Sequence, residues 1–496
     1  MKMTKAQSVS LMNAVAILLS YISKFSKPFQ FIHALSGFES AAADIYAEME
    51  ECLKQGRDVD EFIVKLQEKI EVVVFKESQV NMLRAYHLCM WLDDMITYED
   101  VAGRKLSIYN LVPLRAFSYV AIDTLNDNCT ETGICIHPKL PIFKSFSIMD
   151  DGTEKEKTMS CRDAFTGMNG ELRKISYCKW SSEYIVHNVI IPYEYVEKDE
   201  RSAKGNLRIG FIPISDKTDL IVPDYKIVKD GKYQMNKMYI DHPRHEEVIH
   251  TRLRHGLELA CRNKADIVFS PEMLGTDQTE KQQGNYNEFV RQVYDEAVMN
   301  DHKPPMITVV PTRWCRGINS ASIVYRDGRI LGRQKKYTPY INFKCCSAEG
   351  LRPEKTKELY LIHVYGVHRI AISICAEFID GFDSNFICGQ LGATLVIVPS
   401  FSHGERDFVN QLGTLFPYGT SVVWGDCCGA VVHSPKIIGG CSLIGANEIH
   451  KMGDNCKCKF SCDGSKGCLF LIELPLQVMY SKSRMSSHQP VRHILQ

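Results

Sequence analysis

The chain has 496 residues, of which 45% are hydrophobic and 24% charged, an ordinary globular composition with enough length for two or three hydrophobic cores. Lys and Arg together number 59, and so do Asp and Glu, so the net charge favours neither nucleic acid nor a membrane surface as a partner. An odd count of 19 cysteines in so long a chain argues against a disulfide framework and predicts a reducing, cytoplasmic location.

The N-terminal part has mainly helical patterning. An apolar stretch at 9–19 follows two lysines as in a signal peptide, but it is too short to span a bilayer and no cleavage site follows, so it predicts a buried helix. Apolar residues then recur at helical spacing in three stretches, 39–55, 62–70 and 80–95. Asp93 and Asp94 close the third stretch without a second aspartate motif, which predicts solvated side chains rather than a metal site.

The pattern becomes irregular beyond about residue 126, with possible strands at 142–149 and 184–195. A charged run at 197–205 ends in glycine and is typical of a domain boundary. We therefore expect a mainly helical accessory domain at 1–200, with an irregular, strand-containing end, that offers a surface for a protein partner.

Two strands in the second half of the chain each end near an ionisable side chain. Residues 267–269 form a short strand of buried type, and Glu272 follows just past its end. Residues 323–337 predict a strand, an Asp-Gly hairpin and a second strand that runs up to Lys336. A carboxylate and an ammonium group are thereby expected at strand ends.

A third strand leads to Cys375. Isoleucines alternate with small residues over 370–374, and the small Ala376 follows the cysteine, as in a nucleophile elbow whose next N–H faces a developing oxyanion. A lone cysteine is more commonly a packing residue. A carboxylate, however, can take the thiol proton, and an ammonium group can lower the thiol pKa and stabilise the oxyanion. The three strand ends together therefore predict a thiol hydrolase.

Glu272, Lys336 and Cys375, in this chain order, resemble the Glu-Lys-Cys triad of the nitrilase superfamily, a group of carbon–nitrogen hydrolases. The resemblance covers about residues 205–475. It includes further segments in the family's order: a first strand at 206–213, a helix at 245–261, a strand at 306–311, an Asn-Ser-Ala strand at 319–324, a Gly-Ala strand ending in Pro-Ser at 391–400, a Gly-x-Ser motif at 440–442 and a closing strand at 468–474.

The resemblance implies an α/β fold at 205–480. This would be a nitrilase-like α-β-β-α four-layer sandwich, preceded by the mainly α-helical accessory domain and followed by a flexible tail at 481–496. It implies Glu272 as the general base, Lys336 as the oxyanion-stabilising lysine and Cys375 as the nucleophile. The implied reaction cleaves a non-peptide C–N bond in a small amide or nitrile through a Cys thioester. No cofactor is implied, and a homo-oligomer is expected.

Further residues are candidates for supporting this triad. Glu349 and Glu377 are acids that could stabilise the buried lysine, and the backbone N–H of Ala376 could hold the oxyanion. Tyr337 and His403 are candidates for lining the pocket. Tyr337 follows the lysine where the family has a His-Leu pair, and the family's Pro-Glu end is missing after the cysteine, so the substrate class stays open.

Cys456, Cys458, Cys462 and Cys468 lie close together near the C-terminus and could close a tetrahedral zinc site. Their spacing lacks Cys-x-x-Cys pairs, so we predict no metal and keep zinc as the weaker interpretation. Three alternatives stay open for the whole chain. They are acyl transfer to an amine by the same triad, a non-catalytic nitrilase-fold scaffold or regulatory protein, as in a bacterial defence system, and a zinc-stabilised regulatory protein.

Overall fold

In the computed structural model of the protein, the structure describes residues 5–25, 31–55, 59–99, 105–106, 118–119, 132–139, 145–148, 154–157, 168–172, 174–181, 183–191, 206–214, 226–228, 236–239, 246–274, 283–342, 347–364, 368–402, 406–427, 439–442, 449–452, 468–475 and 491–495. No helix within these segments combines the length and the apolar character that crossing a bilayer requires.

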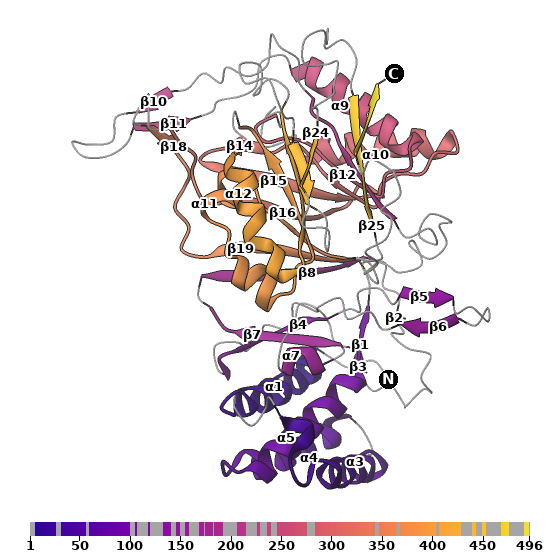
Figure 1. The fold of residues 1–496 in the computed structure, drawn as a ribbon, viewed down its shortest axis with the longest axis vertical. Coiled ribbons are helices and arrows are strands. Elements are labelled where there is room, and N and C mark those ends of the chain that lie inside the picture. The colour runs from indigo at the N-terminus through magenta and orange to yellow at the C-terminus, as the bar shows by residue number, and fades with distance from the viewer. Residues whose placement is uncertain are drawn as a thin grey trace.

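A group of α-helices builds the N-terminal end of the molecule (Figure 1). They are α1 Lys5–Ile22, α3 Phe38–Gln55, α4 Val59–Val74 and α5 Gln79–Met95, with a short 3₁₀ helix, η1, at Ile32–Ala34. Ser78 caps α5, because its hydroxyl accepts the N–H of Asn81 at 3.2 Å. Leu18, Leu66 and Leu88 are fully buried where the helices meet, so packing of their apolar faces holds the group together.

Asp93, near the end of α5, is buried rather than solvated. Its carboxylate accepts the backbone N–H groups of Lys174 at 3.0 Å and Ile175 at 2.9 Å. The prediction of a solvated side chain is therefore wrong for Asp93, because backbone donors satisfy a carboxylate that would otherwise be costly to bury.

Short elements connect the helices to the second half of the chain. They are β1 Ile96–Glu99, β2 Lys105–Leu106, β3 Ser118–Tyr119, β4 Ile134–Pro138, β5 Ser145–Ile148, β6 Glu154–Lys157, α7 Met168–Glu171 and β7 Ile175–Lys179. β1 pairs with β2 and β3, β4 with β7, and β5 with β6. Ile134 and Ile136 of β4 extend the buried core of the helices.

The first of two large sheets has eight strands in the order β14-β15-β13-β12-β9-β25-β26, with β16 paired to β15. The strands are β9 Asn206–Phe211, β12 Ile267–Phe269, β13 Ile307–Val309, β14 Arg313–Cys315, β15 Ile318–Tyr325, β16 Ile330–Lys336, β25 Cys468–Pro475 and β26 Val491–Leu495. β9, β12 and β13 pair in parallel, as their short apolar runs suggest for strands buried on both faces.

The second sheet has seven strands in the order β24-β23-β22-β21-β20-β19-β8. The strands are β8 Tyr184–Ile191, β19 Lys357–Val364, β20 His368–Ile372, β21 Leu395–Ser400, β22 Ser421–Asp426, β23 Gly439–Ser442 and β24 Ile449–Met452. β20, β21 and β22 are parallel, and every one of their residues is buried.

Alternating side chains show what each face of the first sheet contacts. Val268 and Leu469 pack in a core shared with α9, Glu246–Arg262, and α10, Gln283–Met299. The next residue in each strand points the other way, so Phe470 joins a core to which both large sheets contribute. The two sheets therefore pack face to face, and α9 and α10 cover the outer face of the first.

Short helices follow two strands of the second sheet, β20 and β21 (Figure 1). They are α11 Ala376–Asp380, the π-helix η5 Asn385–Gln390, α12 Arg406–Leu415 and the 3₁₀ helix η6 Phe416–Tyr418. Phe408 of α12 stacks on Trp424 of β22, with ring centroids 6.0 Å apart. Between the sheets, Gly425 has to be small, because a Cβ there would lie 2.3 Å from the ring of Phe211.

Strand β8 precedes the expected domain boundary at 197–205 but belongs to the second sheet. It pairs in parallel with β19 along its whole length, beginning with Tyr184 opposite Lys357. Ile191 joins the core between the sheets, whereas Ile190 joins the core of the N-terminal helices. The N-terminal part of the chain is thus joined to the second sheet by a shared strand.

Two further segments were not expected to form sheet structure. Val491–Leu495, expected within a flexible tail, forms β26 and pairs antiparallel with β25. A small sheet with the order β10-β11-β18-β17 consists of β10 Lys226–Val228, β11 Asn236–Tyr239, β17 Ile341–Asn342 and β18 Ser347–Glu349. β10 and β11 project from the body of the molecule (Figure 1). β18 carries Glu349.

Candidate active site

Cys375 lies in a sharp turn between β20 and α11. Its backbone has φ 48° and ψ −114°, a left-handed conformation that costs a non-glycine residue about 1–3 kcal/mol. The Cys375 N–H donates to the carbonyl of Pro399 at 3.0 Å, and its Sγ lies 3.9 Å from the carbonyl oxygen of Phe401. Ala376 begins α11, so its N–H is among the helix-start donors that have no acceptor within the helix.

Lys336 is held between two buried carboxylates. Its Nζ lies 2.7 Å from Glu272 Oε1 and 2.7 Å from Glu349 Oε2. The exposed fraction is 0% for Glu272, 3% for Lys336, 5% for Glu349 and 4% for Cys375, so all four residues are shielded from water. Charged groups in such surroundings persist when they are paired and hydrogen-bonded, as this lysine is.

Asn319 connects the two carboxylates and was not singled out from the sequence as a site residue. Its Nδ2 donates to Glu272 Oε1 at 2.8 Å and to Glu349 Oε1 at 3.2 Å. In the β15–β16 ladder Asn319 is directly opposite Lys336, which puts both side chains on one face of the sheet. The sequence signal is a polar residue at the entry of a strand whose later residues are small or apolar.

The backbone around Glu349 and Glu272 holds both carboxylates in place. Glu349 Oε2 also accepts the N–H of Tyr340 at 3.0 Å. Beyond the end of β12, the N–H of Glu272 donates to the carbonyl of Ser400 at 3.3 Å, and Thr312 Oγ1 accepts the next N–H in the chain at 2.8 Å. The acid therefore stands at the meeting point of the two large sheets.

Electrostatics couple Cys375 to the other two residues. Burial raises the pKa of the Cys375 thiol well above its usual value, and the negative Glu272 adds to this while the Lys336 ammonium opposes it. Burial also raises the pKa of Glu272, against the lowering effect of Lys336. Lys336 thus lowers the pKa of the thiol as expected, but burial and Glu272 together outweigh this effect. With its pKa raised in this way, Cys375 rests as a thiol.

Lys336 itself stays charged. Burial alone would lower its pKa, but the Glu272 and Glu349 carboxylates outweigh burial and raise it. A fixed ammonium ion, a carboxylate able to accept a proton and a thiol therefore converge at one buried point. This combination can deprotonate a nucleophile as it attacks and stabilise an oxyanion.

Glu377 holds the chain segment that follows Lys336. Its Oε2 accepts the N–H of Tyr337 at 2.9 Å and, at shorter distance, the N–H of Thr338. Its Oε1 accepts from Lys357 Nζ at 3.2 Å. The two candidate supporting acids therefore have different surroundings: Glu349 contacts the lysine amine, and Glu377 contacts the backbone beside that lysine.

The remaining candidates are not brought into the centre. The Tyr337 hydroxyl accepts the N–H of Glu358 in β19 at 2.7 Å, so its ring tip is directed toward that strand. His403, Cys456, Cys458 and Cys462 lie outside the described residues, and Cys468 is a partly buried cysteine in β25. Among the residues that the structure describes, no group of three His, Cys, Asp or Glu side chains is placed to hold a metal ion.

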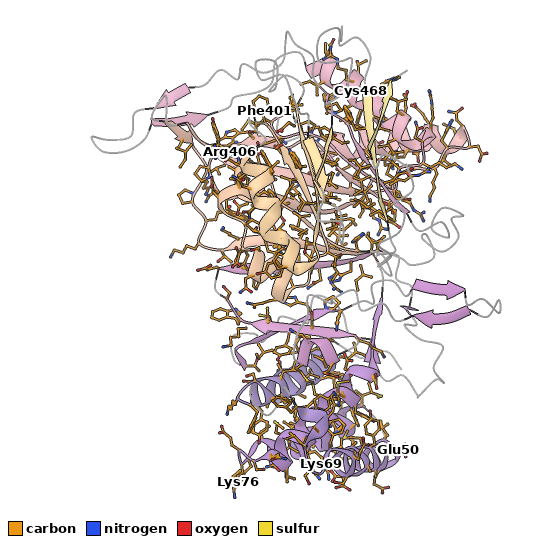
Figure 2. The ribbon with its side chains drawn as sticks, viewed as in Figure 1. Glu50, Lys69, Lys76, Phe401, Arg406 and Cys468 are labelled. Atoms are coloured by element: carbon orange, nitrogen blue, oxygen red, sulfur yellow. The ribbon has the colours of Figure 1, made fainter. Side chains whose placement is uncertain are left out.

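The candidate site lies far from the N-terminal helices. Figure 2 labels Phe401, whose carbonyl faces the Cys375 thiol, toward one end of the molecule and Lys69 and Lys76 toward the other. The helices therefore do not contribute side chains at the centre. Their connection to the second sheet runs through β8.

No family model matches the sequence, and no curated protein matches it. An amidase from Nesterenkonia sp. is similar in structure at 14% identity, covering 55% of this chain and 91% of its own, with a TM-score of 0.35. A mutant of the Nesterenkonia AN1 amidase, from the nitrilase superfamily, has 14% identity, covers 55% of this chain and 92% of its own, and has a TM-score of 0.35.

The glutamine-dependent NAD+ synthetase from Acinetobacter baumannii is similar at 13% identity, covering 54% of this chain and 45% of its own, with a TM-score of 0.34. Each of these is a similarity of backbone over about half of this chain. The described part of the chain is a mixed α/β protein with a buried thiol, carboxylate and ammonium centre at the junction of two sheets.

Proposed function

We propose that the protein is a carbon–nitrogen hydrolase of the nitrilase-superfamily type, with an α-β-β-α four-layer hydrolase region. Its substrate would be a small non-peptide amide or nitrile. The observation that carries the proposal is the contact of Lys336 with two buried carboxylates, Glu272 and Glu349, while the charges of Glu272 and Lys336 both act on the buried Cys375 thiol. A structural ion pair needs no thiol beside it, whereas a nucleophile requires a base and an oxyanion donor.

In the first half of the reaction on an amide, Cys375 Sγ attacks the carbonyl carbon as its proton moves to the Glu272 carboxylate. The π electrons of the carbonyl move to oxygen, where Lys336 Nζ and the Ala376 N–H stabilise the negative charge. Removing one such donor typically costs about 3 kcal/mol of barrier. The oxyanion then collapses, the C–N bond breaks, and the nitrogen takes the proton from Glu272 and leaves as ammonia or an amine.

In the second half, Glu272 takes a proton from water as the water oxygen attacks the thioester carbon. The C–S bond breaks, the acid is released, and the proton on Glu272 returns to the Cys375 sulfur. An amine in place of water would give acyl transfer by the same steps. The raised pKa of Glu272 suits it to this alternation, because it brings the acid closer to the pH of the reaction.

The test measures ammonia and acid release from a panel of aliphatic amides and nitriles, with and without an added amine. Cys375→Ala should abolish both products. The matched control is Cys388→Ala, since Cys388 is equally buried but its raised pKa, about 12, reflects burial without contact with Glu272 or Lys336. Product release by Cys375→Ala at the wild-type rate would contradict the proposal, and a new amide formed with the added amine would favour acyl transfer.

A further inference from the structure

The turn formed by Ser400, Phe401 and Ser402 touches both residues that exchange a proton in the proposed reaction. The carbonyl of Ser400 accepts the N–H of Glu272, and the carbonyl of Phe401 faces the Cys375 thiol. Any group that fixes this turn therefore fixes the base and the nucleophile relative to each other.

Asp426 is that group. It ends β22 directly opposite Ser400 at the end of β21, and only 3% of it is exposed. Its Oδ1 accepts the N–H of Ser402 at 3.0 Å and lies in a short hydrogen bond with the Ser400 hydroxyl. One carboxyl group thus binds the turn at two points.

The hydroxyl of Ser400 has two oxygen neighbours but only one proton. It lies 3.0 Å from the carbonyl oxygen of Gly425, which can only accept, and also contacts Asp426 Oδ1. If Ser400 donates to Gly425, the proton between Ser400 and Asp426 has to come from the Asp426 carboxyl group. A protonated Asp426 satisfies both contacts at once.

The electrostatic surroundings favour the same protonation state. Besides Asp426, the turn contacts the ionisable residues Glu272 and Cys375, and Lys336 is bound to Glu272. Of these only Glu272 acts on Asp426, and it is negative. Burial, opposed by the bonds from Ser400 and Ser402 and reinforced by Glu272, raises the pKa of Asp426 to about 8.

We propose that Asp426 is a positioning residue that is held as a neutral carboxylic acid and clamps the Ser400–Ser402 turn, which in turn holds Glu272 and Cys375 in reactive geometry. This deepens the proposed function and rests on it for the role of Cys375. Loss of the Asp426 proton would place a second negative charge near Glu272 and remove the donor to Ser400. Both changes disfavour a thiolate at Cys375.

The protonation state can be tested without any substrate. Infrared difference spectra of the full chain, recorded on either side of pH 8, should contain the carbonyl band of a protonated carboxylic acid that disappears on the alkaline side. Asp426→Asn should lack this band, and a matched change at an exposed acid, Asp327→Asn, should keep it. An unchanged spectrum in Asp426→Asn would overturn the proposal, whatever the enzyme's activity.

The positioning role is tested by alkylation of Cys375 with iodoacetamide, followed by peptide mass mapping as pH is raised. In the wild type the alkylation rate should level off above about pH 8, because loss of the Asp426 proton offsets the gain in thiolate. In Asp426→Asn it should keep rising, by about tenfold per pH unit. Equal profiles would overturn the positioning role. A Cys375 inert in both proteins, with the infrared band intact, would instead count against the proposed nucleophile.

Discussion

Adjacent lysines in β16 allow the buried ion cluster to be tested with an internal control. Each 2.7 Å contact of Lys336 with a carboxylate corresponds to a gross attraction of about 6 kcal/mol at an effective dielectric constant of about 20. Desolvation offsets most of this, so Lys336→Met, which leaves Glu272 and Glu349 buried without their cation, should destabilise the protein by about 3–5 kcal/mol. It should also slow acylation of Cys375 by about 100–1000-fold, because an oxyanion donor is lost.

Lys335 also contacts two glutamates, but its side chain is partly exposed to solvent. Its Nζ is 3.1 Å from Glu354 and 3.1 Å from Glu358, with 23% of its side chain exposed. Lys335→Met should therefore change stability by no more than about 1 kcal/mol and leave acylation near the wild-type rate. Thermal unfolding midpoints and single-turnover formation of the acyl-enzyme measure both effects. Similar losses in the two variants would refute the assignment of Lys336 to a catalytic ion cluster.

Further predictions concern the groups around that cluster. Glu377→Ala removes the acceptor that holds the backbone after Lys336 and should lower the acylation rate about tenfold. A wild-type acylation rate in this variant would contradict the prediction. Asn319→Leu removes a hydrogen-bond donor from two buried carboxylates and should lower the free energy of unfolding by about 1–3 kcal/mol, as measured from the unfolding midpoint. Because the pKa of Asp426 is raised from 3.8 to about 8, the free energy of unfolding should fall as pH rises between these values. This fall should be absent from Asp426→Asn. Deletion of residues 1–204 removes β8 and should cause aggregation by exposing the edge of β19, as light scattering would show.

The principal residues of the site could be predicted from the sequence because strand ends have local signals. Apolar runs mark β12 and β20, and each is followed within a few residues by a chemically distinctive side chain, Glu272 or Cys375. The Asp-Gly turn before β16 locates Lys336 in the same way. Parallel and antiparallel ladders then bring these strand ends to one place, which the sequence could suggest only through resemblance to a family.

Other features depend on three-dimensional neighbours that have no local signature. Asn319 acts because the ladder register sets it opposite Lys336, and Asp426 because β21 and β22 end side by side. Asp93 looks like any acid at a helix end until its two backbone donors, 81 and 82 residues away, are known. Sequence spacing alone cannot reveal partners at such separations.

A strand was expected at 184–195, but the sheet to which β8 belongs could not be predicted from the sequence. A charged run follows it, and such a run is typical of a domain boundary, yet β8 pairs in parallel with β19 more than 160 residues later in the chain. Tyr184 of β8 places its ring 5.8 Å from Lys357 Nζ, the amine that binds Glu377. The N-terminal part of the chain thereby reaches the backbone beside Lys336 through three side chains, those of Tyr184, Lys357 and Glu377.

The most direct test of the account is to map the acyl group after the wild-type protein reacts with an amide substrate and is quenched in acid. We expect a thioester on Cys375 that is absent from Cys375→Ala and reduced in Lys336→Met. An acyl group on another cysteine such as Cys388, or an adduct that survives in Cys375→Ala, would contradict the claim that Glu272, Lys336 and Cys375 form one catalytic centre.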